Sequence, residues 1–107
     1  MEIDGLDPDC LHVKAVSKKG DIIGTARLLP NHYVGRMCVH ADYRNRGVGG
    51  RMLQYFIDYA DAHGFPALML NAQLSALPFY QKFGFVADSK IFMEADIAHR
   101  HMTRVFS

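Results

Sequence analysis

The chain has 107 residues, of which 50% are hydrophobic and 21% are charged, and its net charge is +1 with neutral histidines. This length suits one domain over residues 1–107 and not two, and the composition excludes a disordered chain. The balanced charge also excludes an extended nucleic-acid surface, because phosphate binding needs a concentrated positive patch.

The N-terminus and the cysteines predict where the protein resides. Residues 1–5 are acidic and have no long apolar core, so they are not a signal peptide. No apolar run approaches the ~20 residues that cross a bilayer. Cys10 and Cys38 form no CxxC pair and indicate no disulfide framework. We therefore expect a cytoplasmic protein that works without a membrane or a nucleic acid.

The first half of the chain predicts three strands joined by short turns. Residues 7–9 have turn chemistry, so we expect order to begin after them. Apolar and polar residues alternate over residues 11–17, branched residues are frequent over residues 22–29, and a third strand is expected over residues 33–40. Short turns between strands produce an antiparallel meander.

The hydrophobic period then changes to that of a helix. Over residues 49–63 the apolar side chains recur at helical spacing, and Gly64 follows where a helix C-cap belongs. Residues 65–71 return to a strand pattern. A strand–helix–strand sequence of this spacing predicts a parallel crossover.

The end of the chain predicts a second helix and a closing hairpin. The helix is expected over residues 75–83, with Ser75 as its N-cap. Strands are expected over residues 84–89 and 98–106, joined through residues 91–96. The fold class is therefore α/β with a mixed sheet, built from an antiparallel meander, a strand–helix–strand unit, a helix and a hairpin.

A glycine-rich segment stands between the third strand and the long helix. It reads Arg44-Asn45-Arg46-Gly47-Val48-Gly49-Gly50. A helix N-terminus offers unpaired N–H groups and a positive dipole end, and glycines let a phosphate approach them. Arg44 and Arg46 add positive charge and forked donors. These residues predict a pyrophosphate site, and a surface turn without a ligand is the alternative.

Two common pyrophosphate motifs do not fit this segment. A Walker A loop ends in Gly-Lys-Ser/Thr, whereas Gly50 is followed by Arg51 and Met52. The dinucleotide fingerprint GxGxxG needs a third glycine, which is absent after Gly47 and Gly49. The segment is therefore expected to bind another pyrophosphate ligand.

Three blocks of sequence carry a resemblance to a known family. Arg44, Gly47 and Gly49 match the Arg/Gln-x-x-Gly-x-Gly/Ala signature of the GNAT superfamily of acyl-CoA N-acyltransferases. Residues 70–73 and 79–85 are similar to that family's strand and helix with a Phe-Tyr-x-x-x-Gly-Phe ending. A third block resembles a bacterial branch of the family and contains Phe92, Glu94, Ile97, His99 and Met102. The resemblance covers roughly residues 11–104.

The resemblance implies a GNAT-like fold and acetyl-CoA as the cofactor. The sheet would open into a V between the strand with residues 37–39 and the strand with residues 68–71. The pantetheine arm would lie in this splay against the backbone around Cys38 and Val39, and the pyrophosphate would meet the amides of residues 45–50. Asn71 would contact the pantetheine amide, and Gln73 the same region. The acetyl group would pass to a small-molecule or peptide amine.

One departure from the family concerns the N-terminus. Family members usually begin with a strand and two helices before the meander, and this chain is expected to lack them, because few residues precede Leu11. The strand over residues 11–17 would then be an exposed edge with an apolar patch in contact with water. We therefore expect a homodimer, or a domain completed by a partner chain.

Acetyl transfer to an amine needs a neutral amine, a polarised thioester and a protonated leaving thiolate. Tyr80 is the candidate acid, because a phenol is protonated at neutral pH and the resemblance places this one beside the CoA sulfur. A purely packing role is the alternative, because Phe79, Phe83 and Phe85 surround it in the sequence.

The general base is less defined by the sequence. Glu94 and His99 match the bacterial branch of the family. His40 is a third candidate, because a histidine titrates near neutral pH. Water is a fourth way to relay the proton. For each side chain, the alternative is a solvated position without a catalytic role.

Two other chemistries are weaker. His99 and His101 would share one face of a strand, but no carboxylate or cysteine at convincing spacing completes a metal site, so we expect none. Cys38 could carry the acetyl group covalently, although a strand cysteine is more often a small buried hydrophobe. The alternative to an N-acetyltransferase is a non-catalytic acyl-CoA-binding or regulatory module.

Overall fold

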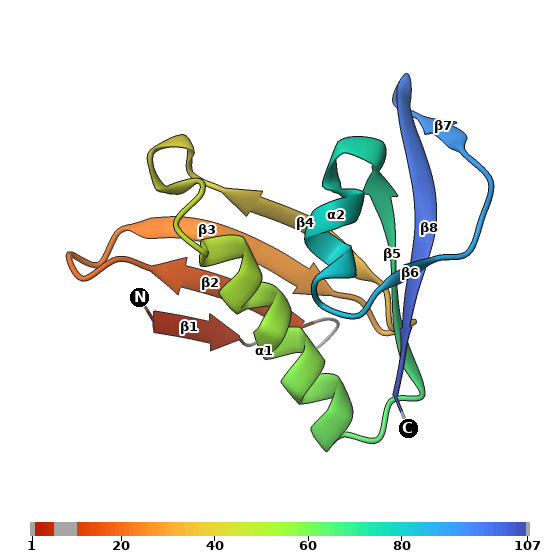
Figure 1. The fold of residues 1–107 in the computed structure, drawn as a ribbon. Helices are drawn as coiled ribbons and strands as arrows, with labels where there is room; N and C mark the ends of the chain where they lie inside the picture. The colour runs from red at the N-terminus through yellow and green to blue at the C-terminus, as the bar shows by residue number, and fades with distance from the viewer. Residues whose placement is uncertain (1, 6–10, 107) are drawn as a thin grey trace.

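The computed structural model of the chain describes residues 2–5 and 11–106, and its strands form two sheets (Figure 1). The first sheet has the order β1–β2–β3–β4, with β1 at Glu2–Gly5, β2 at Leu11–Val16, β3 at Ile22–Leu28 and β4 at Val34–Val39. The second has the order β5–β8–β6, with β5 at Ala67–Gln73, β8 at Ile97–Val105 and β6 at Val86–Ala87, and β7 at Phe92–Glu94 also pairs with β8. The helices are α1 at Val48–Ala62 and α2 at Leu77–Gln81, with the short 3-10 helices η1 at Ala41–Tyr43 and η2 at Leu74–Ala76.

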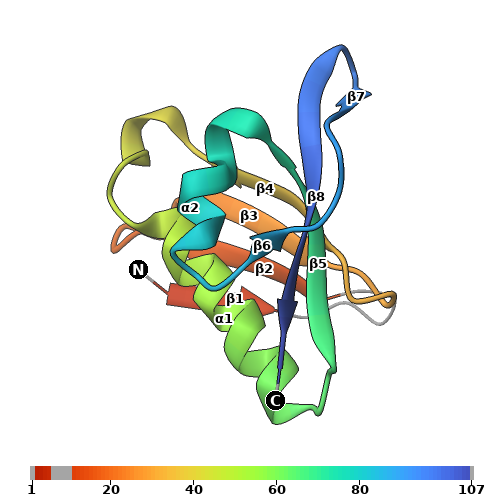
Figure 2. The same ribbon diagram turned by 45° about the vertical axis from the view of Figure 1, so that its right-hand side comes forward.

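The first sheet confirms the predicted antiparallel meander, and α1 lies across one of its faces (Figure 2). Val13 and Ala15 on β2 point into the core, whereas His12 and Lys14, which alternate with them, are exposed. On α1, the apolar side chains at helical spacing form the buried stripe; they are Val48, Met52, Leu53, Phe56, Ile57 and Ala60. A Cβ atom on Gly24 of β3 would lie 3.0 Å from Met52 Cε and 3.1 Å from Val48 Cγ1. This glycine therefore lets the helix approach the sheet closely.

The N-terminal strand corrects three expectations, the first of which is that no strand precedes the meander. β1 pairs antiparallel with β2, from Glu2 opposite Val16 to Gly5 opposite Val13. The strand over residues 11–17 is therefore not an exposed edge, and order does not begin only after residues 7–9, which lie outside the described residues. Val13 and Ala15 are 1% and 0% exposed, so the expected wet apolar patch is buried under α1. Backbone hydrogen bonds do not require apolar side chains, which is why a short acidic segment pairs here.

The second sheet and α2 differ from the prediction in detail. The helical segment begins as η2 and becomes α2 at Leu77, with Ala76 at its N-cap, so Ser75 is not the cap. The segment over residues 91–96, expected as a plain connection, contains β7 and a tight turn to β8. Ala95 and Asp96 form this turn with φ angles of 51° and 62°. No helix in the described residues is long and apolar enough to cross a membrane.

β4 and β5, which α1 connects, are not paired along their length. Within residues 2–5 and 11–106 they meet at one isolated parallel bridge between Tyr33 and Met69, where the Met69 N–H donates to the His32 carbonyl oxygen at 3.0 Å. Beyond the bridge the two strands diverge (Figure 1). Parallel pairing between the two strands is thus limited to this bridge, and beyond it they form the predicted V-shaped splay.

A β-bulge changes the direction of β4 beside this splay. Thr25 of β3 pairs with Cys38, but Arg27, two residues further on, pairs with Gly35 rather than with the residue two before Cys38. β4 therefore contains one extra residue between these pairs. Bulges of this kind bend a strand and redirect its side chains, and here the bent strand forms one wall of the opening.

Candidate functional site

A cleft of about 580 Å³ lies where β4, the start of α1 and α2 meet. We call it the glycine-turn cleft, because residues 47–50 form part of its wall. Arg44, Asn45, Val39 and Tyr80, which the sequence singled out, also line it. The structure thus brings together residues from the two strongest sequence blocks. Met37, Tyr43 and Phe79 complete the wall and were not predicted from the sequence.

Gly47 and Gly49 keep the start of α1 open. Gly47 is the N-cap residue with a φ of 79°, and no side chain in the described part of the chain caps the helix. The first amides of an α-helix lack intrahelical partners and can donate to an anion. A Cβ on Gly49 would lie 3.7 Å from side chains of three cleft walls, those of Met37, Val39 and Phe79. Any larger side chain at position 49 would therefore enter the cleft.

Gly50 has a different role from its neighbour. A Cβ at this position would lie 3.0 Å from Phe83 Cζ, which is tighter than ordinary van der Waals contact. Gly50 therefore permits close packing of α1 against the segment after α2. Gly49 and Gly50 are adjacent in the sequence but have different roles: Gly49 keeps the cleft open, and Gly50 permits a packing contact.

The two arginines of the segment lie differently. Arg44 lines the cleft, and its Nε donates to the Val39 carbonyl oxygen at 3.3 Å. Arg46 is exposed, does not line the cleft, and holds its guanidinium 5.2 Å from the centre of the Tyr43 ring. Arg44 is therefore better placed to contact a ligand in the cleft than Arg46.

Tyr80 combines a position at the cleft with partial burial. Its ring contacts the rings of Phe79 and Phe85, with centroids 5.1 Å and 6.0 Å away. Burial raises the pKa of the Tyr80 phenol from its ordinary value of 10.0, because it disfavours the charged phenolate. Tyr80 is therefore a protonated donor at neutral pH, and it also has the packing contacts that the alternative interpretation expected.

Cys38 faces away from the glycine-turn cleft. It lines a separate cavity of about 470 Å³ on the other face of the first sheet, together with Lys14, Thr25 and Arg27. The His40 N–H donates to the Ile23 carbonyl oxygen on β3 at 2.7 Å. Because backbone groups two residues apart on a strand point the same way, the N–H and C=O of Cys38 also point towards β3. The backbone of Val39 instead faces the splay. Of the two predicted positions, only Val39 lies at the cleft; Cys10 lies outside the described residues.

A second cavity, of about 350 Å³, contains three of the remaining predicted residues, and Gln73 does not line it. Asn71, Glu94 and His99 line it, together with Tyr33 and four neighbours from the segment 29–35. Asn71 alternates along β5 with Leu70 and Ala72, which are buried in the core. The cavity therefore lies on the face of the second sheet away from the core, and we call it the far-face cavity. Tyr80 does not line it, and His40 lines neither this cavity nor the glycine-turn cleft.

His99 is held in one tautomer in the far-face cavity. Its side chain is buried, and Nδ1 lies 2.7 Å from the carbonyl oxygen of Ile97. A carbonyl oxygen can only accept, so Nδ1 carries the proton and Nε2 of the neutral ring keeps its lone pair. The ring also stacks on Phe92, with centroids 5.9 Å apart. Nε2 of His99 is therefore available as an acceptor, and its role as the base stays a prediction.

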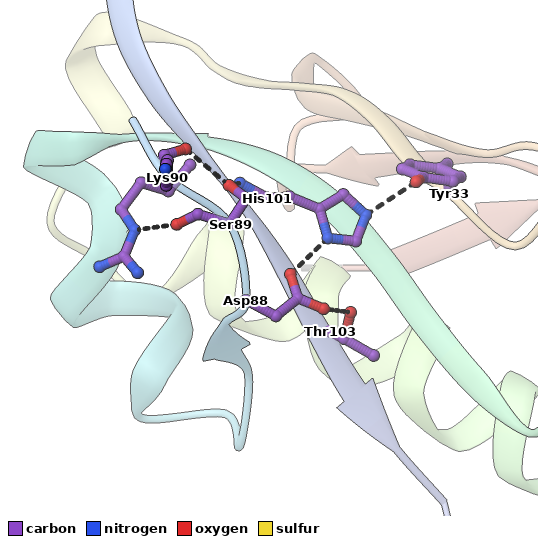
Figure 3. Close-up of polar contacts among 7 residues, drawn as sticks. Tyr33, Asp88, Ser89, Lys90, His101 and Thr103 are labelled. Carbon is purple, nitrogen blue, oxygen red and sulfur yellow. Dashed lines mark hydrogen bonds and ion pairs between the residues drawn. The ribbon is translucent and has the colours of Figure 1, made fainter. Parts of the chain in front are cut away.

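His101 belongs to a hydrogen-bonded chain that the sequence did not predict (Figure 3). Its Nε2 lies 2.7 Å from the Tyr33 hydroxyl, and its Nδ1 lies 2.5 Å from Asp88 Oδ1. Thr103 donates to the other oxygen of Asp88 at 2.6 Å. The bonds from Thr103 and then from His101 lower the pKa of the Asp88 carboxyl. No cluster of three metal-binding side chains occurs among the residues that the structure describes.

The chain is similar in sequence to known acetyltransferases. The family model described as the acetyltransferase (GNAT) domain matches residues 4–106. The chain is 31% identical over 106 residues to YjcF of Bacillus subtilis, an uncharacterized N-acetyltransferase; the alignment covers 96% of this chain and 76% of that protein.

Solved structures of acyltransferases are also similar to this chain. An acyl-CoA N-acyltransferase from Pseudomonas aeruginosa matches with a TM-score of 0.80 and 26% identity, over 94% of this chain and 71% of that one. A Bacillus anthracis protein solved in complex with acetyl coenzyme A matches with a TM-score of 0.78 and 26% identity, over 94% of this chain and 65% of that one.

Proposed function

The chain belongs to the GNAT acetyltransferase domain family, and from this premise we propose that it transfers the acetyl group of acetyl-CoA to an amine by direct attack. One observation carries the proposal. The glycine-turn cleft borders β4 at Met37 and Val39. The far-face cavity borders the same strand at Val34 and Gly35, and β5 at Asn71, so a donor and an acceptor can meet along β4 at the opening towards β5.

The glycine-turn cleft fits the acetyl-CoA side of the reaction. The amides of residues 47–50 and the Arg44 guanidinium suit a pyrophosphate, since both donate to anionic oxygens. The Val39 backbone faces the splay, where an extended pantetheine amide can pair with it. The Bacillus anthracis relative is described in complex with acetyl coenzyme A, which supports the same ligand here.

Tyr80 is the proposed acid for the departing thiolate. Its raised pKa lies above the reference value of a thiol, near 8.5, so the phenol keeps its proton until negative charge develops on the sulfur. Tyr80 then stabilises that charge through a hydrogen bond. Full transfer to the thiolate is uphill, because the phenol is the weaker acid, and it is completed as the thiol leaves and solvent reprotonates Tyr80.

The far-face cavity is the proposed acceptor site. The Glu94 carboxylate would attract an ammonium group into it, and His99 Nε2 has the lone pair needed to remove a proton. Asn71 lies in this cavity rather than in the glycine-turn cleft, so its proposed pantetheine contact would come from the far face. The acceptor is a small-molecule or peptide amine.

Turnover measured with a panel of amines tests the proposal. The panel contains small amines, amino acids, aminoglycosides and peptide N-termini, and free CoA release is followed with a thiol reagent. Acetylation of one class supports the enzyme. Tight acetyl-CoA binding by calorimetry without turnover of any amine would favour the alternative, a non-catalytic acyl-CoA-binding module.

The oligomeric state and the compartment stay predictions. A homodimer or a partner chain was expected from an exposed β2 edge, and that argument no longer applies, because β1 covers the edge. Light scattering at micromolar concentration, with and without acetyl-CoA, tests the homodimer. A cytoplasmic location likewise stays a proposal, to be tested by cell fractionation.

A further inference from the structure

The hydrogen-bonded chain through His101 joins three separate parts of the fold (Figure 3). Tyr33 comes from the turn before β4, His101 from β8, and Asp88 from the loop after β6. Tyr33 also lines the far-face cavity beside Glu94 and His99. The chain therefore runs from the proposed acceptor site to a partly exposed carboxylate.

The chemistry of the three groups fixes the direction of the chain. An ionised carboxylate has only acceptor atoms, so His101 Nδ1 donates to Asp88. Nε2 of the neutral ring then carries a lone pair, and the Tyr33 hydroxyl donates to it. The lone pairs of the Tyr33 oxygen remain to accept a proton. The arrangement follows the logic of a carboxylate–imidazole–hydroxyl triad, with a phenol as the last member.

Backbone and neighbouring hydrogen bonds, in addition to those of the carboxylate, hold Asp88 in position. The Asp88 N–H donates to the His101 carbonyl oxygen at 3.0 Å, and the His101 N–H donates to Ser89 Oγ at 2.8 Å. Arg100 Nε donates to the Ser89 carbonyl oxygen at 2.9 Å. The loop is thus fastened to β8 over consecutive residues, which holds the carboxylate against the imidazole.

We propose that Tyr33, rather than His99 in the same cavity, receives a proton from the acceptor amine and passes its own to His101, which Asp88 orients and stabilises as an imidazolium. His99 Nε2 then accepts a hydrogen bond from the amine. This inference rests on the proposed function. The ammonium N–H bond breaks as a Tyr33 O–H bond forms, and the original Tyr33 proton moves to His101 Nε2. The amine nitrogen keeps the electron pair with which it attacks the thioester, and solvent later removes the imidazolium proton. Of the three hydrogen-bonded residues, Tyr33 is the catalytic residue, and His101 and Asp88 act through it.

A purely mechanical role is the competing interpretation. Tyr33 also forms the bridge with Met69 at the base of the splay, so the same bonds could only pin the two sheets together. A purely structural contact and a proton relay differ in how kcat/KM depends on pH. In the described structure the titratable groups in contact with His101 are Asp88 and Tyr33, and its partner across the strands, Asn71, is uncharged.

The first test needs no acceptor. Nitrogen-15 NMR of the full chain at pH 7.5 reports which imidazole nitrogen of His101 carries the proton. The relay requires the Nδ1–H form. A dominant Nε2–H form would overturn the proposal, because Nε2 could not then accept the Tyr33 proton.

The second test compares variants with the best amine of the panel. Tyr33→Phe keeps the ring, and its kcat is expected to fall roughly a hundredfold with an unchanged KM for acetyl-CoA. Asp88→Asn keeps an acceptor for Nδ1 but removes the charge, so the acid limb of kcat/KM should move to lower pH. Tyr55→Phe on α1, at a position that lines neither cavity, is the matched control and should retain wild-type values.

The outcomes separate the relay from the function on which it rests. Wild-type kcat in Tyr33→Phe, or an acid limb that stays in place in Asp88→Asn, would leave the acetyltransferase standing and reject the relay. Wild-type protein that turns over no amine would reject both. Loss of kcat in Tyr33→Phe together with a moved limb in Asp88→Asn supports the relay, because a pin would not move the limb.

Discussion

Gly49 is the residue at which acetyl-CoA binding can be tested most directly. In Gly49→Val a branched side chain would extend between Met37, Val39 and Phe79 into the cleft. We expect the affinity for acetyl-CoA to fall at least about tenfold, which is ~1.4 kcal/mol. Calorimetry measures it, and circular dichroism checks that the variant is folded. Unchanged affinity in a folded variant would mean that the ligand does not use this cleft.

Tyr80 is the residue that separates chemistry from binding. In Tyr80→Phe we expect kcat to fall roughly a hundredfold while the dissociation constant of acetyl-CoA stays near the wild-type value. The fold should persist, because the ring contacts with Phe79 and Phe85 do not need the hydroxyl. Near-complete kcat in this variant would reduce Tyr80 to a packing residue.

The raised pKa of Tyr80 also predicts a pH dependence. Because the folded pKa lies above 10.0, the phenol stays protonated through neutral and mildly alkaline pH. Its contribution to stability is complete below 10.0 and is lost as pH rises through the folded value. Urea unfolding of wild type and Tyr80→Phe at pH 8 and pH 11 measures this. The wild type should lose more stability than the variant over that interval.

Asp88 predicts the opposite pH dependence. Its pKa is lowered from 3.8 by the bonds from Thr103 and His101, so its contribution to stability is present above 3.8 and is lost as pH falls through the lower folded value. Asp88→Asn should therefore flatten the acid side of the stability curve. Asp61→Asn, at an exposed position on α1, is the control. An equal acid loss in wild type and Asp88→Asn would contradict the prediction.

At the scale of elements, the approach of α1 to the first sheet depends on Gly24. In Gly24→Ala the new Cβ would meet Val48 Cγ1 at 3.1 Å and the Cys38 carbonyl oxygen at 3.3 Å. We expect a loss of about 1–3 kcal/mol in the free energy of unfolding, as for other overpacked cores. Gly35→Ala on the neighbouring strand is the matched control, because its Cβ has no neighbour nearer than 3.7 Å. Urea unfolding of both variants makes the comparison, and equal losses would mean that α1 can shift.

At the scale of the whole molecule, the splay predicts that acetyl-CoA stabilises the fold. The two sheets meet at the Tyr33–Met69 bridge and then separate, so a ligand in the opening would contact both. At a ligand concentration of 100 times the dissociation constant, binding to the folded state alone adds about 2.7 kcal/mol. Thermal unfolding should show a Tm that rises with acetyl-CoA concentration. Gly49→Val should show a much smaller rise, and an equal rise in both proteins would place the ligand elsewhere.

The sequence alone predicted the parts of this protein that depend on local patterns. Alternation over residues 11–17 and helical spacing over residues 49–63 placed β2 and α1 within a residue or two, because burial on one face dictates such spacing. The glycine-rich segment predicted the open start of α1, because phosphate chemistry needs small residues at a helix N-terminus. The family followed from three motif blocks, each of which is a short local pattern.

Only the tertiary structure decided the features that depend on pairing between distant segments. β1 was missed because a short acidic strand has no apolar signature, and its partner supplies the backbone bonds. The β7–β8 hairpin was missed because Ala95 and Asp96 adopt positive φ without the usual Asn-Gly signal. Tyr33, Asp88 and His101 lie far apart in sequence, and no spacing rule brings them together. The alternation of β4 placed Val39 at the splay and Cys38 on the opposite face, a choice that register makes and composition does not.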